Sequence, residues 1–271
     1  MKETINLKND AETAMRLNEI CNLVAIDLKD QLVNRFVNSS QQIMVYHYFR
    51  LLNELCCQAG KALMSNAYSS AETLTRVIIE QAANQLYISL DEGARARALL
   101  RSSKALTQKN GKNWVAYLDS QGVVSSVANV RRNNGEKLLT NFDKKWPHTE
   151  SYPNVKQLFE VLGWGNHYHS FYAPLCDSVH SYSDDMANLV MLYEMSGVLK
   201  DDLILLMQAT ETERRRLATY HFVVAVGLRS EVLTRICERL SIETPIETLQ
   251  PSFNDLQKVI SNHESYDHRR L

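Results

Sequence analysis

The sequence has 271 residues, of which 45% are hydrophobic and 23% are charged, and its net charge is −1. These values are ordinary for a globular protein, and they exclude a disordered chain and a protein built of long membrane-spanning segments. Nine glycines and five prolines are few for this length, so the composition favours long helices over many short strands.

The five cysteines form no C-x-x-C pair, and two of them, Cys56 and Cys57, are adjacent. An odd number without metal-binding spacing predicts buried thiols in a reducing compartment rather than disulfides or a zinc site. The N-terminal segment MKETINLKND is polar and lacks the apolar core of a secretory signal. We therefore expect a cytoplasmic protein that makes no membrane contact and needs neither a metal nor another cofactor.

Three segments resembling capping boxes precede the first apolar stretches: Asn9-x-x-Glu12, Ser39-x-x-Gln42 and Ser69-x-x-Glu72. They predict helices over Asp10–Val37, Ser40–Asn66 and Ser69–Leu90. Hydrophobic residues recur at helical spacing in each, and Leu23 and Ile43 are among the side chains expected to face the core. Short connections between these helices predict antiparallel neighbours.

Two further helices are expected in the middle of the chain, over Ala94–Asp119 and Ser126–Trp146. Gly111 is expected to kink or end the first, and Asn133–Gly135 to interrupt the second. Residues 147–154 contain two prolines and form the clearest loop. We expect this loop to separate two halves, 1–146 and 155–271, of a single domain rather than two independent domains.

The second half is also helical in pattern, over Val155–Leu162, Gly165–Ser181 around Pro174, and a long segment Lys200–Leu240. The apolar segment Asp184–Glu194 is ambiguous in type. Pro245 and Pro251 mark a loop before a last short helix. No alternating strand pattern persists over several segments. The sequence predicts an all-α protein, a multi-helix bundle whose long C-terminal helix can support a homodimer.

The charge is unevenly distributed along the chain. Between residues 93 and 145 there are eleven lysines and arginines and three acids, which gives +8 and leaves −9 for the remainder. A chain of this kind can bind phosphate groups without being basic overall.

The basic segment supplies the candidate residues for RNA or phosphate binding: Arg97, Arg101, Lys104, Lys112 and Trp114. The cations recur at helical spacing, and Trp114 with Tyr117 offers rings on which bases can stack. The alternative is a solvated helix face that docks on an acidic patch of another subunit.

Arg76 and Glu80 lie one turn apart within the apolar stretch Ser69–Leu90. They are expected to face each other or a distant polar partner, and His180 is the best distant partner. Tyr168, Tyr172 and Cys176 precede His180 at four-residue spacing on one helix face.

Two interpretations of Arg76, Glu80 and His180 stay open. The first is a structural ion pair or a polar stripe on the helix. The second is a catalytic pocket in which Asp177 or Asp184 supports His180 as a general base.

A second catalytic candidate is Arg216 with His221, within the run RRRLATYH at residues 214–221. An arginine and a histidine can stabilise charge and accept a proton when an RNA 2′-hydroxyl attacks the adjacent phosphate, without a metal. Chance alone produces about 1.5 such spacings in a chain of this composition, so a solvated arginine-rich face is the alternative.

The patterns A-x-x-L-x-R-x-x-x-E-x-x-x-x-x-x-Y at Ala71–Tyr87 and Y-x-x-x-Y-x-x-x-C-x-x-x-H at Tyr168–His180 carry a resemblance. Over roughly Gln42–Ser183 the chain resembles an uncharacterised bacterial all-helical family that is similar in general build to the HEPN superfamily. The resemblance implies a helical bundle, often dimeric, and in many members a metal-independent ribonuclease. The HEPN arginine–histidine signature maps onto Arg216 and His221, where Leu217 replaces the usual polar residue.

We therefore expect a HEPN-like RNA-binding or metal-independent ribonuclease effector in bacterial antiphage or toxin–antitoxin defence. The alternative is a non-enzymatic interaction subunit or inhibitor of a defence complex. The expected partners are RNA or another phosphate-bearing ligand, a protein of a defence system, and a second copy of the chain.

Overall fold

The computed structural model describes residues 5–180, 200–243 and 246–268, and this part of the chain is helical without a strand. The all-α prediction is confirmed. The helices are α1 (Leu7–Asp27), α2 (Lys29–Asn34), α3 (Ser39–Met64), α4 (Tyr68–Ser89), α5 (Ala94–Ser120), α6 (Ser126–Lys145), α7 (Val155–Val161), α8 (Gly165–His167), the π-helix η1 (Tyr168–Tyr172), α9 (Ala173–His180), α11 (Lys200–Arg239) and α12 (Ile246–His268).

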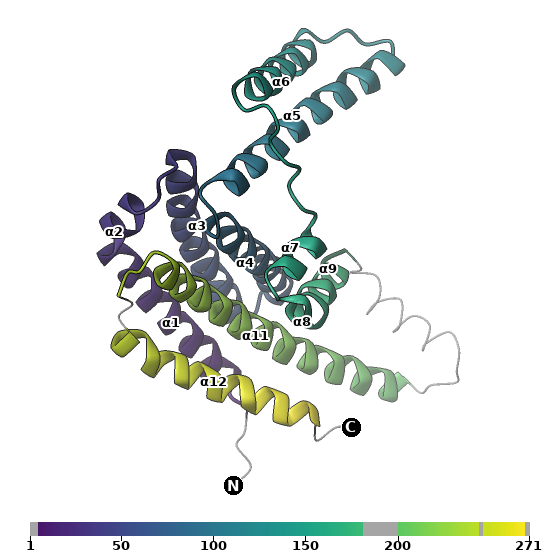
Figure 1. Ribbon diagram of the computed structural model, residues 1–271. Helices are drawn as coiled ribbons and strands as arrows, with labels where there is room; N and C mark the ends of the chain where they lie inside the picture. The colour runs from purple at the N-terminus through teal and green to yellow at the C-terminus, as the bar shows by residue number, and fades with distance from the viewer. Residues whose placement is uncertain (1–4, 181–199, 244–245, 269–271) are drawn as a thin grey trace.

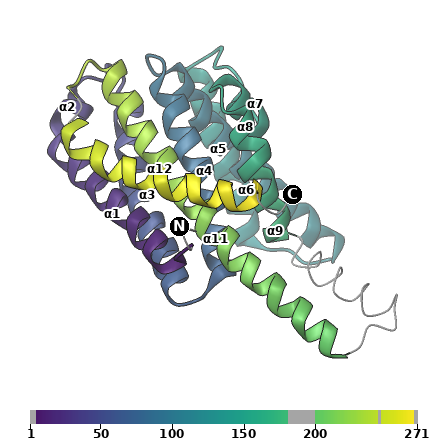
Figure 2. The same cartoon turned by 90° about the horizontal axis from the view of Figure 1, so that it is seen from below.

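The described helices other than α5 and α6 form what we call the body, and α11 lies at its centre. The 40 residues of α11 confirm the predicted long C-terminal helix. It packs against α4, α1, α12 and α3, and α12 crosses over α1 and α11 (Figures 1 and 2). Its middle part is buried on nearly every side: Phe222, Val223, Ala225 and Val226 have no exposed surface. A helix that is apolar all round needs neighbours on all sides, which explains its central position.

Helix α4 packs closely against α3 and α11. Ala71, Ala82 and Ala83 are fully buried there, and their small side chains let the helix axes approach. Burying large neighbours such as Ile78 and Leu86 contributes about 2 kcal/mol each in transfer free energy. The helix predicted over Ser69–Leu90 is confirmed, and its apolar residues at helical spacing face the core.

Helices α5 and α6 form an antiparallel hairpin that projects from the body (Figure 1). We call residues 94–145 the arm. The chain enters it at Gly93, whose φ of +104° lies in the left-handed region that favours glycine. Helix α6 packs along α5, and α5 also contacts α3 and α4. The arm coincides with the basic segment of the sequence.

The glycines of the arm do not interrupt its helices, contrary to our prediction for Gly111 and Asn133–Gly135. A Cβ on Gly111 would lie 3.0 Å from the backbone of Arg132, and one on Gly135 would lie 2.9 Å from that of Gln108. These glycines therefore allow the two backbones to touch, as small residues do where helices cross closely. Their role is in tertiary packing, so local propensity could not show it.

Several predicted helix boundaries require correction. The first predicted helix is divided at Leu28, where no glycine or proline marks the break. The last helix is longer than expected and continues through Pro251. The predicted capping boxes lie inside their helices, and Asn6 and Asn38 cap α1 and α3 instead. A full capping box occurs at Asn154 and Gln157, ahead of α7.

Two side chains expected in the core are on the surface: Leu23 is 53% exposed and Ile43 is 70% exposed. The predicted helix around Pro174 is continuous as α8, η1 and α9, and Pro174 is the second residue of α9. The ambiguous segment Asp184–Glu194 lies outside the described residues.

Candidate functional site

Helix α4 carries a row of polar residues at successive turns: Glu72, Arg76, Glu80 and Asn84. Each of them bonds to a segment that follows α4 in the chain. Arg214 of α11 lies 3.2 Å from the Glu72 carboxylate, and Tyr152 donates a 2.6 Å hydrogen bond to Asn84. The row therefore fastens α4 to later segments rather than forming a solvated stripe.

The centre of this row meets η1 and α9. The Tyr172 hydroxyl donates to Glu80 at 2.8 Å and accepts from Arg76 at 3.4 Å. Arg76 Nε donates to Cys176 Sγ at 3.0 Å, and its guanidinium lies 5.5 Å from the centre of the Tyr172 ring. Among the described residues no ion pair joins Arg76 directly to Glu80, because the phenol stands between them. Arg76 and Glu80 are therefore joined through a distant polar partner, the Tyr172 hydroxyl, and not by direct contact.

Burial of Tyr172, with its hydrogen bond to Glu80, raises the pKa of its phenol well above the usual range. The phenol therefore stays protonated and acts as a donor at neutral pH. The cluster holds a half-buried guanidinium and a half-buried carboxylate bridged by a neutral hydroxyl. Such a group can orient an anionic ligand or lock two helices together.

His180, the third member predicted for this cluster, is the last residue of α9. Its side chain lies outside the described residues. The segment expected to reach Arg76 and Glu80 does reach them, through Tyr172 and Cys176, which precede His180 at four-residue spacing.

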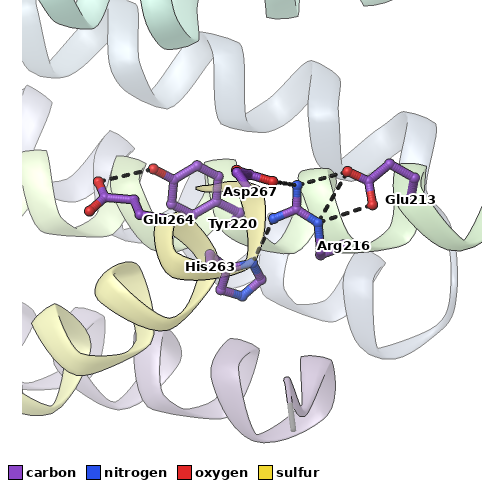
Figure 3. Close-up of polar contacts among 6 residues, drawn as sticks. All are labelled: Glu213, Arg216, Tyr220, His263, Glu264 and Asp267. Carbon is purple, nitrogen blue, oxygen red and sulfur yellow. Dashed lines mark hydrogen bonds and ion pairs between the residues drawn. The ribbon is translucent and has the colours of Figure 1, made fainter. Parts of the chain in front are cut away.

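Arg216, from the second predicted pair, is 5% exposed and lies between α11 and α12 (Figure 3). Its guanidinium binds Glu213 at 2.8 Å and Asp267 at 2.5 Å. Arg216 Nη1 also lies 3.4 Å from His263 Nδ1. Arginine only donates, so Nδ1 of His263 accepts and the ring proton sits on Nε2.

That Nε2 lies 3.2 Å from the Asp10 carboxylate, and His263 has no exposed surface. The chain of contacts from Asp10 through His263 to Arg216 therefore joins α1, α12 and α11. Nothing in the local sequence around His263 distinguishes it from a surface residue, so its role depends on the tertiary fold.

His221 lies on another side of α11 from Arg216, because five residues rotate a helix by about 140° beyond one full turn. Its ring is 6.0 Å from that of Phe171, and its buried Nδ1 has no hydrogen-bond partner among the described residues. Burial, with the positive charge of Arg216 and the nearby His263, lowers the pKa of His221 to about 4. The structure does not bring the arginine and the histidine into one open site.

The predicted RNA-binding residues all lie in the arm. Arg101 binds Asp143 at 2.8 Å and Lys112 binds Glu136 at 3.4 Å, both across the seam between α5 and α6. Exposed lysines of the arm to which no described residue is joined by an ion pair are Lys109, Lys137, Lys144 and Lys145, and Lys145 Nζ lies 4.5 Å from the centre of the Trp146 ring. Lys104 and Arg97 are half-buried.

Trp114 lies on the other side of that seam, where the Arg131 guanidinium is 5.9 Å from its ring centre. Further large apolar side chains are exposed along the arm. We call this set the apolar strip: Leu106, Trp114, Tyr117, Val127, Val130 and Leu138, which are between 37% and 66% exposed. The surface of the arm therefore interleaves apolar and cationic side chains, since Val130 and Lys137 lie two turns apart on the same side of α6.

Two negative findings concern the described residues. They contain no group of three or more histidine, cysteine or acidic side chains arranged to hold a metal ion. None of their helices combines the length and the apolar character that crossing a membrane requires.

Comparison with known proteins places the chain in a family. No curated protein and no solved structure matches it. The sequence profile described as "Family of unknown function (DUF5677)" matches residues 42–194, which are more than half of the 271-residue chain. This match confirms the expected membership of an uncharacterised all-helical family over nearly the predicted range. The chain therefore belongs to the Family of unknown function (DUF5677).

Proposed function

We propose that the protein is an RNA-binding effector of HEPN-like build, and that it contacts RNA phosphates with the cationic faces of the arm. The observation that carries this proposal is the folding of the basic segment, with a net charge of +8, into one projecting hairpin. A projecting cationic element concentrates positive potential where a polyanion can reach it.

The contacts proposed to bind phosphates are the exposed lysines Lys109, Lys137 and Lys144. Arg101 and Lys112 flank them, each already beside an arm carboxylate. Phosphate contacts of this type position RNA without reading its sequence. Binding is therefore expected to tolerate many sequences and to weaken with salt.

Binding has more support than cleavage. The arginine–histidine pair that the HEPN signature requires is divided between two faces of α11, with Arg216 held by two carboxylates. If the protein cleaves RNA, Arg76 and Glu80 are the better candidates for the cleavage site, because both side chains are only half-buried. The resemblance suggests bacterial antiphage or toxin–antitoxin defence as the biological setting, and we include this setting in the proposal.

The test is a titration of fluorescein-labelled RNA, single-stranded and duplex, with full-length protein, followed by fluorescence anisotropy. The arm variant carries Lys109→Glu, Lys137→Glu and Lys144→Glu. The matched control carries Lys61→Glu and Lys156→Glu, exposed on the body, with Lys258→Glu, also exposed, so that both variants change the charge equally. We expect the arm variant to bind at least about tenfold more weakly and the control to remain within about twofold to threefold of wild type.

The salt dependence gives an independent readout. Losing three phosphate contacts should reduce the slope of log K against log salt by about 2 for a single strand. Equal weakening in both variants, or no binding by wild type, would refute the arm as an RNA site.

Cleavage is tested on the same RNA in the presence of a chelator, with wild type, Glu80→Gln, His180→Ala and His221→Gln. Product formation that the Glu80 or histidine variants abolish would establish the ribonuclease version. Intact RNA, or cleavage unchanged in all three variants, would restrict the proposal to binding.

A second candidate function, an interaction subunit without enzymatic activity, is favoured by the apolar strip. Exposed Trp114 and Tyr117 with Arg131 are the residue types that dominate the energetics of protein interfaces. Protein association through the apolar strip is not expected to weaken as salt increases, whereas RNA binding is. The two functions can therefore be separated experimentally.

A further inference from the structure

We propose that a recess between α1 and α3 binds a small molecule through an oxyanion, a carboxylate or a phosphate, and that the buried Arg229 supplies the positive charge that attracts it. The recess is formed by the body and not by the arm, so this inference goes beyond RNA binding.

Arg229 of α11 is a buried cation to which the described residues offer no negative charge. It is 3% exposed, and no described carboxylate forms an ion pair with it. Its Nη1 donates to the main-chain oxygen of Asn18 at 2.7 Å and to Asn18 Oδ1, whereas its Nη2 has no hydrogen-bond partner among the described residues. The thiols of Cys21 and Cys56 are close enough to interact with its charge, but burial raises the pKa of both, so they are neutral. Buried charges are ordinarily paired, and Arg229 is therefore suited to attract an anion.

Two asparagine amides carry the effect of this charge outward. Arginine only donates, so Asn18 turns Oδ1 towards Arg229 and Nδ2 towards α3. There Asn18 Nδ2 donates to Asn53 Oδ1 at 3.1 Å and lies 3.5 Å from Cys57 Sγ. Asn53 Nδ2 is consequently left without a hydrogen-bond partner among the described residues. Both amides present their positive ends away from Arg229, and hydrogen bonds in such a chain polarise one another.

The two amides line an open recess of about 410 Å³, a size typical of small-molecule sites. Asn18 is 2% exposed and marks the inner end, while Glu12, Arg16 and Glu19 line the recess from exposed positions at its rim. The two rim carboxylates repel an anion. The favourable place for an oxyanion is therefore the inner end, beside Asn53 Nδ2.

The donors at the inner end select the chemical class of the ligand. Carboxylate and phosphate oxygens only accept, and their charge strengthens a hydrogen bond from the Asn53 amide. The charge of Arg229 acts on them through a buried and weakly screened region, where electrostatic attraction is stronger than in water. A bare ion fills little of the recess, so we expect the oxyanion to be one end of a larger molecule whose other end meets the rim.

The test uses full-length protein and two probes, sodium acetate and sodium phosphate. Such small ions bind weakly, so each is titrated to about 50 mM at constant ionic strength. The side-chain amide of Asn53 is followed by NMR, and we expect its resonances to shift and saturate in wild type. The affinity of each variant for the same probes is measured by calorimetry.

Two variants remove the two parts of the site. Asn53→Leu removes the donor at a half-buried position, and Arg229→Gln keeps an amide group but removes the charge. Each should bind the probes at least about tenfold more weakly. The matched controls Asn113→Leu and Arg50→Gln make the same substitutions at exposed positions and should remain within about twofold of wild type.

The variant with Lys109→Glu, Lys137→Glu and Lys144→Glu separates this recess from the arm. It should keep wild-type affinity for the probes at Asn53, whether or not the arm binds RNA. Binding of acetate alone, of phosphate alone or of both supports the proposal and identifies the oxyanion.

Three results would overturn the proposal: no saturable shift at Asn53 in wild type, unchanged affinity in both recess variants, or loss of binding in the arm variant alone. Circular dichroism and the thermal midpoint show whether each variant is folded. If Arg229→Gln does not fold, Asn53→Leu decides the result.

Discussion

The buried histidine His221 leads to a quantitative prediction about stability and pH. Its ring packs against Phe171, and its pKa is lowered from an ordinary 6.5 to about 4 by burial, by Arg216 and by His263. The folded protein therefore keeps His221 neutral at pH values where the unfolded chain binds a proton on the same ring.

The sign follows from the lowered pKa. Above pH 6.5 both states are neutral at His221 and its contribution to the pH dependence is nil. Between pH 6.5 and about 4 the unfolded chain binds more protons than the folded one, so the free energy of unfolding falls as the pH falls. The interval of roughly 2.5 pH units corresponds to a loss of about 3 kcal/mol, a large part of the 5–15 kcal/mol typical of a domain.

The perturbation is His221→Phe, which keeps an aromatic ring among aromatic neighbours and removes the titration. The free energy of unfolding is measured by urea denaturation at intervals from pH 7.5 to 4. The difference between variant and wild type should change by about 3 kcal/mol in favour of the variant across this interval. The control His47→Phe makes the same substitution at an exposed position and measures any general effect of replacing a histidine by phenylalanine.

An NMR titration of the His221 ring checks the cause directly and should show no midpoint near 6.5. A constant difference between the His221 variant and wild type at every pH would refute the reasoning, because it would mean that His221 binds its proton equally in both states.

Three further changes test the packing. Arg216→Ala removes a buried cation whose carboxylate partners are 29% and 45% exposed and so keep part of their hydration, and it should destabilise by about 1–3 kcal/mol in urea unfolding, whereas Arg215→Ala, at an exposed pair, should cost less than about 1 kcal/mol. Gly135→Ala places a Cβ 2.9 Å from a facing backbone and should cost about 1–3 kcal/mol, while Gly165→Ala, with nothing within 4 Å, should be neutral or stabilising; a similar effect of both would contradict the close contact. Tyr172→Phe removes the hydroxyl between two charged side chains and should cost about 1–3 kcal/mol, and an unchanged urea midpoint would show that this bridge does not stabilise the fold.

The candidate clusters show how far sequence patterns can define a site. The spacing of Arg76 and Glu80 in an apolar helix correctly indicated charges that need distant partners, and the segment containing Tyr172 and Cys176 supplies them. Which group would stand between the charges was not encoded locally, because the two segments are about ninety residues apart in the chain.

The sequence by itself determined the fold class, the long C-terminal helix and the separate basic segment, because helical periodicity, scarce glycine and proline, and charge clustering are local properties. Only the tertiary structure decided that the basic segment stands out as an arm, since this depends on which helices pack against it. It also converted Gly111 and Gly135 from expected helix breaks into contact points and buried Arg216 beside Asp267. These outcomes depend on contacts between residues distant in the chain, which a local pattern does not contain.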